Sequence, residues 1–503
     1  MKELRPYQEE ALQDIRASVG QGVRRLVVQA PTGSGKTLLA AAIGQGAQRK
    51  NNKLVFVVPA ISLIDQTVDM FYAEGIRDIG VIQANHVLTD WSKPIQVASI
   101  QTIRARKAYP EAAVVLVDEC HQLHAEHVKW MSHPDWQNVP FVGLSATPWT
   151  KGLGRYFESL LVMSTTRELI EQKYLSPYTV FAADHPDLSE VKIVAGDYHE
   201  GQLSAVMQSG ELVANIINTY QDKWNKGKTF CFGVDCAHAQ MLQARFLDAG
   251  ISAAYQDAKT TMKERNAIKA GFHDGTYSIV CNVGTLTTGV DWDVRCLILA
   301  RPTKSEMLFV QIIGRALRTA PGKDKAIILD HTDTTMRLGF ASDIHHDYLN
   351  GGRFDEAAKV IRKPALPKPC ARCACLIPVG VKVCPSCGAE RVAPVSQIFE
   401  REGVLVQFDG AFRKKGDRKA HTYTIQEKAR FFAQLKGYCL LRGYKPGWAA
   451  MKYKDKFEVW PDWSIRDVQP MAAGPEVLQW IRAGQIRWAR SKNNPNSNSY
   501  RQD

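Results

Sequence analysis

The first third of the chain repeats one pattern, in which a short continuous apolar run is followed by a turn and then by a helical stretch. The apolar runs occupy residues 25–30, 53–59, 95–100, 113–120 and 141–146. Apolar runs without polar alternation, separated by helices, are typical of strands in a parallel sheet that is covered on both faces. The pattern therefore predicts an α/β domain, the first lobe, over residues 1–164.

The same pattern returns in the middle of the chain. Its apolar runs occupy residues 228–234, 251–255, 277–283, 295–300 and 325–330. The preceding segment, 165–215, has a weaker pattern, and we expect it to connect the lobes and to lead into the second one. The chain therefore contains a second predicted lobe of similar construction, over residues 165–335.

After about Thr335 the pattern gives way to smaller modules. We predict a linker over residues 336–365, a module rich in Cys, Pro and Gly over 366–392, and a basic, aromatic module of α/β or helical structure over 393–470. Residues 471–503 form a basic tail whose polar end predicts partial disorder. The chain has no apolar run of about 18 residues and no apolar signal centre near its start, which favours a cytoplasmic protein without a membrane segment.

The positive charge of the chain is concentrated in its C-terminal part. The formal net charge is +13, and the residues from Pro364 onward hold 24 Lys and Arg against 12 Asp and Glu. Clustered Lys and Arg attract phosphate because binding releases counterions. The alternative is a basic surface that serves only solubility.

A glycine-rich loop, APTGSGKT, follows the first apolar run and precedes a helical stretch. Its glycines let backbone N–H groups curl around phosphate oxygens at a helix N-terminus. Lys36 is expected to reach the β- and γ-phosphates of ATP, and the Thr37 hydroxyl to ligate Mg²⁺. The predicted nucleotide-binding residues of the loop are Thr32, Gly33, Ser34, Gly35, Lys36 and Thr37. A glycine turn in an unrelated enzyme is the alternative for this loop taken alone.

Two adjacent acids end the strand predicted over residues 113–120. At the carboxyl edge of a parallel sheet they would face the nucleotide. We expect Asp118 to orient Mg²⁺, Glu119 to polarise the attacking water, and His121 to sense the γ-phosphate region.

Further segments join these two in a fixed order. They are RPYQ (5–8), VVPAISLIDQT (57–67), ASIQTI (98–103), LSATP (144–148), NVGTLTTGVDWD (282–293) and QIIGRALR (311–318). Together with the loop and the acid pair they resemble the motifs of superfamily 2 helicases of the DExH type, over about residues 1–335. The resemblance implies two RecA-like lobes that hydrolyse ATP and move along DNA or RNA.

The resemblance also assigns residues of the second lobe to the nucleotide. Gln311, Arg315 and Arg318 have helical spacing, so the two arginines are expected about one turn apart on one helix face. From lobe two they would reach the γ-phosphate only when the lobes close, and an arginine finger accelerates hydrolysis by roughly 10³–10⁵.

Other nucleotide contacts are carried over from the family. Arg5 and Gln8 would read the adenine, Asp291 would bond the ribose, and Gly289 would permit the close approach of the ribose.

Nucleic acid would cross both lobes through sugar and phosphate contacts, which carry little sequence information. Pro59, Thr102, Thr285 and Thr287 occupy the matching motif positions. For each lone Thr the alternative is an ordinary turn residue.

Two CxxC pairs lie ten residues apart in the module at 366–392. Four thiolates at this spacing predict a zinc ribbon with structural tetrahedral Zn²⁺. The predicted ligands are Cys370, Cys373, Cys384 and Cys387. Cys375 is spare, although it could replace Cys373 in a less regular site.

The 393–470 module interleaves basic and aromatic residues. Exposed rings can stack on splayed bases, whereas rings that form the core of a small helical module would not. The rings concerned are Tyr438, Tyr444, Trp448, Tyr453, Phe457 and Trp460, and for most of them we favour the core interpretation. The cluster Arg413–Lys419 is the better phosphate contact.

Within superfamily 2, residues 83–106, the DECH segment and the cysteine cluster resemble RadD-type bacterial DNA-repair helicases and related phage helicases. The resemblance implies a DNA substrate, a role in repair, recombination or phage replication, contact with a single-strand-binding or recombination protein, and a place at the bacterial nucleoid or in a phage-infected cell. Two alternatives stay open, namely an RNA helicase and a DNA-binding ATPase switch that recruits partners without unwinding.

Overall fold

A computed structural model of the chain forms two compact units, residues 1–395 and 396–503, which are described separately. The structure describes residues 3–83, 85–182, 186–194, 196–208, 210–287, 290–352, 366–390, 424–445, 447–457, 459–474, 477–478 and 480–481. Over these residues, no helix has the length and apolar character needed to cross a membrane.

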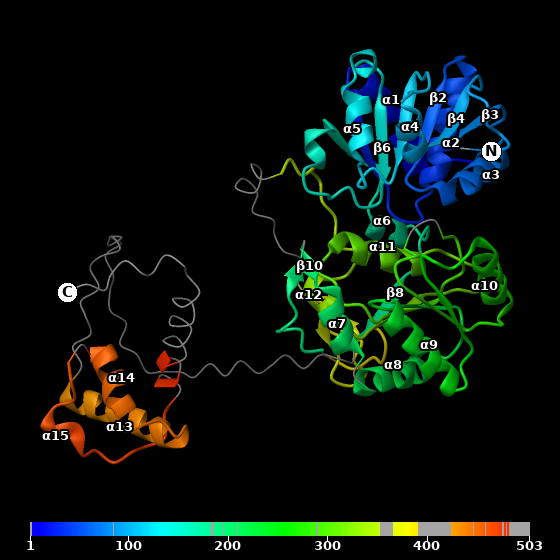
Figure 1. Cartoon of the computed structure of the whole chain (residues 1–503). Coiled ribbons are helices and arrows are strands. Elements are labelled where there is room, and N and C mark those ends of the chain that lie inside the picture. Colours follow the sequence, from blue (N-terminus) through cyan, green and yellow to red (C-terminus); the bar gives the residue numbers. More distant parts are fainter. Residues whose placement is uncertain are drawn as a thin grey trace. The chain divides into compact units, whose positions relative to one another are not determined.

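Lobe one is a parallel sheet of seven strands in the order β3-β4-β2-β5-β6-β1-β7 (Figure 1). The strands are β1 (Arg25–Gln29), β2 (Leu54–Val58), β3 (Ile79–Ile82), β4 (Ile95–Ser99), β5 (Val114–Asp118), β6 (Phe141–Ser145) and β7 (Ser159–Val162). The helices are α1 (Pro6–Gly20), α2 (Lys36–Arg49), α3 (Ile64–Ala73), α4 (Ile100–Arg106) and α5 (Ala125–Ser132), with short 3₁₀ turns at Ile61–Leu63, Pro134–Trp136 and Leu153–Arg155.

Successive side chains of each strand enter opposite halves of the core, as strand geometry requires. Leu26 and Val28 pack with α1, α2 and α3, whereas Val27 packs with α4 and α5. Both faces of the sheet are therefore covered, which explains the continuous apolar runs.

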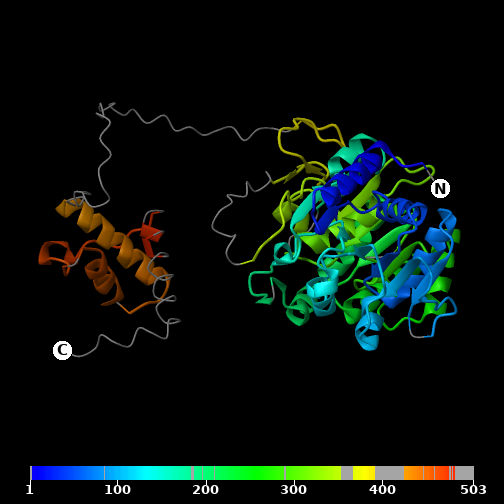
Figure 2. The same cartoon turned by 90° about the horizontal axis from the view of Figure 1, so that it is seen from above.

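Lobe two is a parallel sheet of six strands in the order β12-β13-β11-β14-β15-β8. The strands are β8 (Tyr178–Phe181), β11 (Thr229–Phe232), β12 (Ala253–Gln256), β13 (Ile279–Asn282), β14 (Cys296–Leu299) and β15 (Ala326–Asp330). The helices are α6 (Thr166–Glu171), α7 (Glu200–Met207), α8 (Gly210–Lys223), α9 (Cys236–Asp248), α10 (Met262–Asp274), α11 (Glu306–Ala316) and α12 (Thr334–Leu338), and a hairpin joins β9 (Ile193–Val194) to β10 (Asp197–Tyr198). Figure 2 shows unit one from above, with its two lobes overlapping in that view.

All ten predicted strands are confirmed, and the fold class is confirmed with them. Three further strands of the two large sheets, β3, β7 and β8, escaped prediction. All three lie at sheet edges, where a strand has one neighbour. A short segment with a weak apolar pattern can form a strand there, because less of its surface is buried.

The cysteine-rich module covers the β8 edge of lobe two. It holds a small antiparallel pair, β16 (Lys368–Pro369) and β17 (Leu376–Ile377). Cys375 bridges to Phe181 of β8, and the Ala182 N–H donates to the Ala374 carbonyl at 3.2 Å.

The described residues of unit two contain helices and no strand, so the helical alternative for this module is correct. Its described helices are α13 (Ile425–Leu441), α14 (Gly447–Phe457) and α15 (Trp463–Arg466). They enclose a separate core that includes Phe432, Leu435 and Tyr453. The predicted phosphate-contact cluster Arg413–Lys419 lies outside the described residues.

Candidate functional site

The glycine-rich loop joins β1 to α2, and it has the backbone that its glycines predict. Gly33 and Gly35 have φ of 84° and 85°, in the left-handed region that favours glycine. A Cβ at Gly35 would also collide with the Gln8 amide. The helix begins at Lys36, so its free N–H groups point into the loop.

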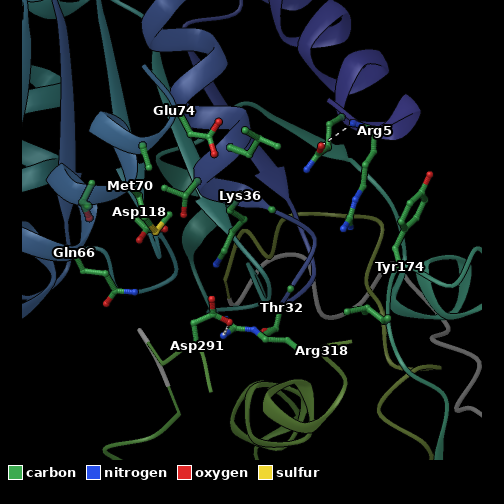
Figure 3. Close-up of a pocket in the computed structure, with 18 of the residues that line it drawn as sticks. Arg5, Thr32, Lys36, Gln66, Met70, Glu74, Asp118, Tyr174, Asp291 and Arg318 are labelled. Atoms are coloured by element: carbon green, nitrogen blue, oxygen red, sulfur yellow. Dashed lines mark hydrogen bonds and ion pairs between the residues drawn. The ribbon is translucent and has the colours of Figure 1, made fainter. Parts of the chain in front are cut away.

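A cavity of about 830 Å³ opens at this loop between the two lobes (Figure 3). Its volume lies within the usual range for small-molecule and cofactor sites. The sequence-predicted residues that line it are Arg5, Gln8, Thr32, Gly33, Gly35, Lys36, Thr37, Asp118, Glu119, Asp291, Arg315 and Arg318. Ser34 is fully buried beneath the loop, and Gly289 lies outside the described residues.

Lys36 and the acid pair meet at the floor of the cavity. Lys36 Nζ lies 2.6 Å from Glu119 Oε1. Burial opposes ionisation of Glu119, but the Lys36 ammonium and the His121 ring outweigh it and hold the pKa of this carboxyl well below its usual range. Burial raises the pKa of Asp118 to about 6, with Lys36 opposing the shift. The pKa values of the two neighbouring carboxyls are therefore shifted in opposite directions, upward for Asp118 and downward for Glu119.

A chain of polar contacts runs from the acid pair into the other lobe. His121 Nδ1 lies 3.3 Å from Glu119 Oε2 and 2.9 Å from Ser145 Oγ. Gln311 of α11 reaches across with its amide Nε2, which lies 3.2 Å from His121 Nε2 and donates to Thr147 Oγ1 at 3.0 Å. Gln311 thus joins lobe two to His121, which contacts Glu119 of the acid pair.

The two arginines of lobe two face the same cavity, but they do not share a helix. α11 ends at Ala316, so the predicted one-turn spacing of Arg315 and Arg318 on one helix is wrong. Arg318 instead pairs with Leu175 in an isolated antiparallel bridge, because residues 174–176 lie against the end of the helix.

Both arginines converge on one carbonyl at the cavity wall. Arg315 Nη1 donates to the Val290 carbonyl at 3.1 Å, and Arg318 Nη1 donates to the same carbonyl and to Asp291 Oδ1 at 2.6 Å. Burial lowers the pKa of Arg315 to about 9, and Arg318 adds to the shift. The Nε of Arg315 is buried without a partner in the described part of the chain, so it could still donate to an anion.

The far end of the cavity is built around the loop carbonyl of Ser34. Tyr7 Oη and Gln8 Nε2 donate to it at 2.9 and 2.8 Å. Arg5 lies over the Tyr174 ring at 4.4 Å. Sequence reasoning missed Tyr174, because it lies in the weakly patterned connection and carries no motif.

Lobe two also contacts the loop through a helix glycine. An ideal Cβ at Gly314 would lie 2.7 Å from the Cβ of Thr32. The absence of a side chain at Gly314 is therefore what allows α11 to approach the loop.

The predicted nucleic-acid residues are mostly engaged locally. Thr102 Oγ1 lies 2.9 Å from Ser99 Oγ, and Thr287 Oγ1 donates to the Gly284 carbonyl at 2.6 Å. Thr285 lies near the Gln256 amide. The Pro59 carbonyl accepts from Gln101 Nε2 at 3.1 Å.

The four predicted zinc ligands meet outside this cavity. Their Sγ atoms lie within 4.8 Å of one another, with Cys370 and Cys387 3.8 Å apart and Cys373 and Cys384 3.6 Å apart. Zn–S bonds of about 2.3 Å in a tetrahedron require S···S distances of about 3.8 Å, so the geometry fits zinc. Burial opposes ionisation of Cys384, but backbone N–H groups of Cys387 and Ser386 hold its pKa at about 6.

Cys375 does not belong to this cluster. It is fully buried against β8, and its thiol lies near the Leu376 carbonyl. The four-cysteine cluster is consistent with structural zinc and leaves Cys375 as a core residue.

Comparisons with known proteins agree with this geometry. The family model described as "Type III restriction enzyme, res subunit" matches residues 1–150, and "Helicase conserved C-terminal domain" matches 210–320. A 51.5 kDa protein of a Lactococcus phage is 26% identical over 456 residues, which cover 86% of this chain and 95% of the phage protein. A Saccharomyces cerevisiae protein described as "Putative ATP-dependent helicase IRC3" is 30% identical over 353 residues, 65% of this chain and 51% of its own length.

Among solved structures, one described as a fragment of "a putative HsdR subunit of a type I restriction enzyme from Vibrio vulnificus YJ016" has a similar fold. The TM-score is 0.54 at 22% identity, covering 69% of this chain and 66% of that one. The chain spans about half the length of the yeast relative. With the loop, the acid pair and the arginines assembled between the two matched lobes, the chain carries the two ATPase domains of a superfamily 2 helicase.

Proposed function

We propose that this chain hydrolyses ATP between its lobes and uses their opening and closing to move along DNA or to remodel it. The observation that carries the proposal is Gln311, which bonds from lobe two to both His121 and Thr147 of lobe one. His121 in turn contacts Glu119. Because one chain of contacts joins the acid pair to the other lobe, a change at the nucleotide would alter the position of the lobes.

Lobe one would supply the groups that act on the phosphates. Lys36 would exchange its Glu119 partner for the β- and γ-phosphates, which frees the carboxylate to polarise water. Before the exchange, Lys36 and His121 lower the pKa of Glu119, so the carboxylate is already ionised when the nucleotide enters. Thr37 and Asp118, which both line the cavity, would hold Mg²⁺, and this ion would neutralise phosphate charge.

Lobe two would complete the site when the lobes close. Arg315 would act as the finger, since its buried Nε still lacks an acceptor among the described residues. Arg318 and Asp291 form an ion pair at the rim, where Asp291 would bond the ribose. Arg5 and Gln8 lie at the far end of the cavity, where they would read the adenine.

One observation favours DNA over RNA as the track. The family model that matches lobe one describes a subunit of restriction enzymes, and restriction enzymes act on DNA. The basic excess of the chain lies beyond the lobes, where it adds phosphate-binding charge that suits either polymer. We further propose a role in repair, recombination or phage replication, with a single-strand-binding or recombination protein as a partner.

The test is ATP turnover without polymer and then with single-stranded DNA, duplex DNA and RNA at one stated salt concentration. We expect DNA to stimulate turnover most strongly. Stimulation by RNA alone would support an RNA helicase, and stimulation by DNA without strand displacement in a duplex assay would support a switch.

Two variants serve as controls for this assay. Lys36→Ala should abolish turnover with every polymer. Glu119→Gln should keep ATP and DNA binding but stop hydrolysis, so that it holds the nucleotide and polymer together. Normal turnover in Glu119→Gln would contradict the assignment of the base.

A further inference from the structure

The described aromatic rings of unit two range from buried to largely exposed, with Tyr444, Trp448, Phe457 and Trp480 between the extremes. Phe431, Phe432, Tyr438 and Tyr453 are less than 10% exposed and form the core. Trp460 and Trp463 are 56% and 78% exposed. Large exposed apolar side chains that lie close together mark interaction sites more often than they occur by chance.

Each exposed tryptophan has a cation over its ring. Lys454 Nζ lies 4.7 Å from the centre of the Trp460 ring, and Arg466 Cζ lies 4.0 Å from that of Trp463. Residues 424–481 carry nine Lys and Arg against six Asp and Glu. The two rings and their two cations together are named here the tryptophan surface.

The backbone that presents the tryptophan surface is held in place. Asp462 caps α15 by accepting from the Ser464 N–H at 2.9 Å and from its hydroxyl at 2.8 Å. Pro461 and Ile465 are buried on either side of the cap. The exposure of Trp463 is therefore a feature of an ordered turn and does not come from a frayed end.

The geometry points to single-stranded nucleic acid as the ligand of the tryptophan surface. The rings would stack on bases while Lys454 and Arg466 neutralise the adjoining phosphates. We commit to single-stranded DNA, and only the choice of DNA over RNA rests on the proposed function. Trp460 and Trp463 are three residues apart, hence within about 11 Å, so one short oligonucleotide can reach both.

Duplex DNA and an acidic peptide fit less well. In a duplex the base faces are already stacked on one another, so the rings would find only the backbone. A peptide carboxylate would use the two cations, but it would leave the two exposed indole faces without a matching group.

The experiment counts short oligonucleotides bound per full-length chain. Labelled dT8 and rU8 are titrated without nucleotide by fluorescence anisotropy and by calorimetry. The variants are Trp460→Ala with Trp463→Ala, the conservative Trp460→Phe with Trp463→Phe, and Leu441→Ala as a control at an 81% exposed apolar position without a cation over it. Basal ATP turnover and the melting temperature check that every variant is folded.

We expect the double alanine variant to bind one dT8 fewer than the native chain. If the site is weakened without being lost, its Kd for dT8 should rise at least about fivefold for each tryptophan removed. The phenylalanine variant should restore most of the binding, and Leu441→Ala should be unaffected. This result is expected whether or not DNA stimulates ATP turnover. The number of dT8 molecules bound by the variant is compared with the number bound by the native chain, and any dT8 bound by the lobes is the same in both.

Unchanged stoichiometry and affinity in the double alanine variant would overturn the proposal. The proposal would also be overturned if the double alanine variant lost binding to a labelled peptide of alternating Asp and Phe but still bound dT8. That result would assign the tryptophan surface to an acidic protein segment. Loss of rU8 alone would overturn the choice of DNA.

Discussion

Adding a single methyl group at Gly314 should impair closure of the lobes without lowering the stability of the folded chain. In Gly314→Ala the new Cβ would lie 2.7 Å from Thr32 Cβ and 3.1 Å from its Oγ1, where ordinary contact needs 3.4–4 Å. Overpacking of this kind costs about 1–3 kcal/mol. Because the clash joins α11 to the loop of the other lobe, the cost falls on the closed arrangement alone.

The same substitution should stabilise lobe two by itself. Alanine inside a helix is about 0.5–1 kcal/mol more favourable than glycine. We therefore expect kcat/KM for DNA-stimulated ATP turnover to fall by about 5- to 150-fold, while the melting temperature stays equal or rises by a few degrees.

A double-mutant cycle with Thr32→Gly tests the contact itself. Removing the Thr32 side chain gives the Gly314→Ala methyl room, so Gly314→Ala should lower turnover much less in the Thr32→Gly background than in the native chain. Turnover within twofold of the native value in Gly314→Ala would refute the reasoning, because the hydrolysing state would then not contain this contact.

Three further outcomes are expected. Arg315→Ala should bind a fluorescent ATP analogue but hydrolyse ATP at least about 10³-fold more slowly in single-turnover assays, with Arg315→Lys between it and the native chain; equal rates would remove the finger assignment. Cys384→Ser should lose its zinc by elemental analysis and melt several degrees lower because β8 loses its cover, whereas Cys375→Ala should keep the metal. Turnover should fall as the pH drops through about 6, since a protonated Asp118 cannot orient Mg²⁺, and more Mg²⁺ should move this midpoint to lower pH. If the pH midpoint of this fall did not change with the Mg²⁺ concentration, Asp118 would be excluded as its cause.

Most of the fold and of the candidate site could be predicted because the relevant signals are local. The central strands carry long apolar runs, and the loop, the acid pair and Gln311 lie in short motifs whose residues act at fixed spacing. What could not be predicted depends on tertiary contact. β3, β7 and β8 are strands because a neighbour pairs with one edge, and Arg318 leaves the helix because residues 174–176 lie against its end.

The same distinction applies to aromatic residues. Composition alone gives Tyr453 and Trp463 the same weight, and the sequence interpretation favoured a core role for most rings. Tyr453 is 2% exposed and Trp463 is 78% exposed, because α13 and α14 pack around the first while the second opens a short capped turn. Burial of a ring in a small module is decided by packing, which a basic and aromatic composition does not encode.

Strand β8 has a consequence for the order in which the chain can fold during synthesis. Its only large-sheet neighbour is β15, and its other side is closed by Ala374 and Cys375. At about 5–20 residues per second, β8 leaves the ribosome roughly 7–30 s before β15 does. A newly made β8 therefore waits with two open edges, while the seven-stranded sheet of lobe one, whose last strand is β7, can already form. Lobe two is expected to be the part of a nascent chain that most needs a chaperone.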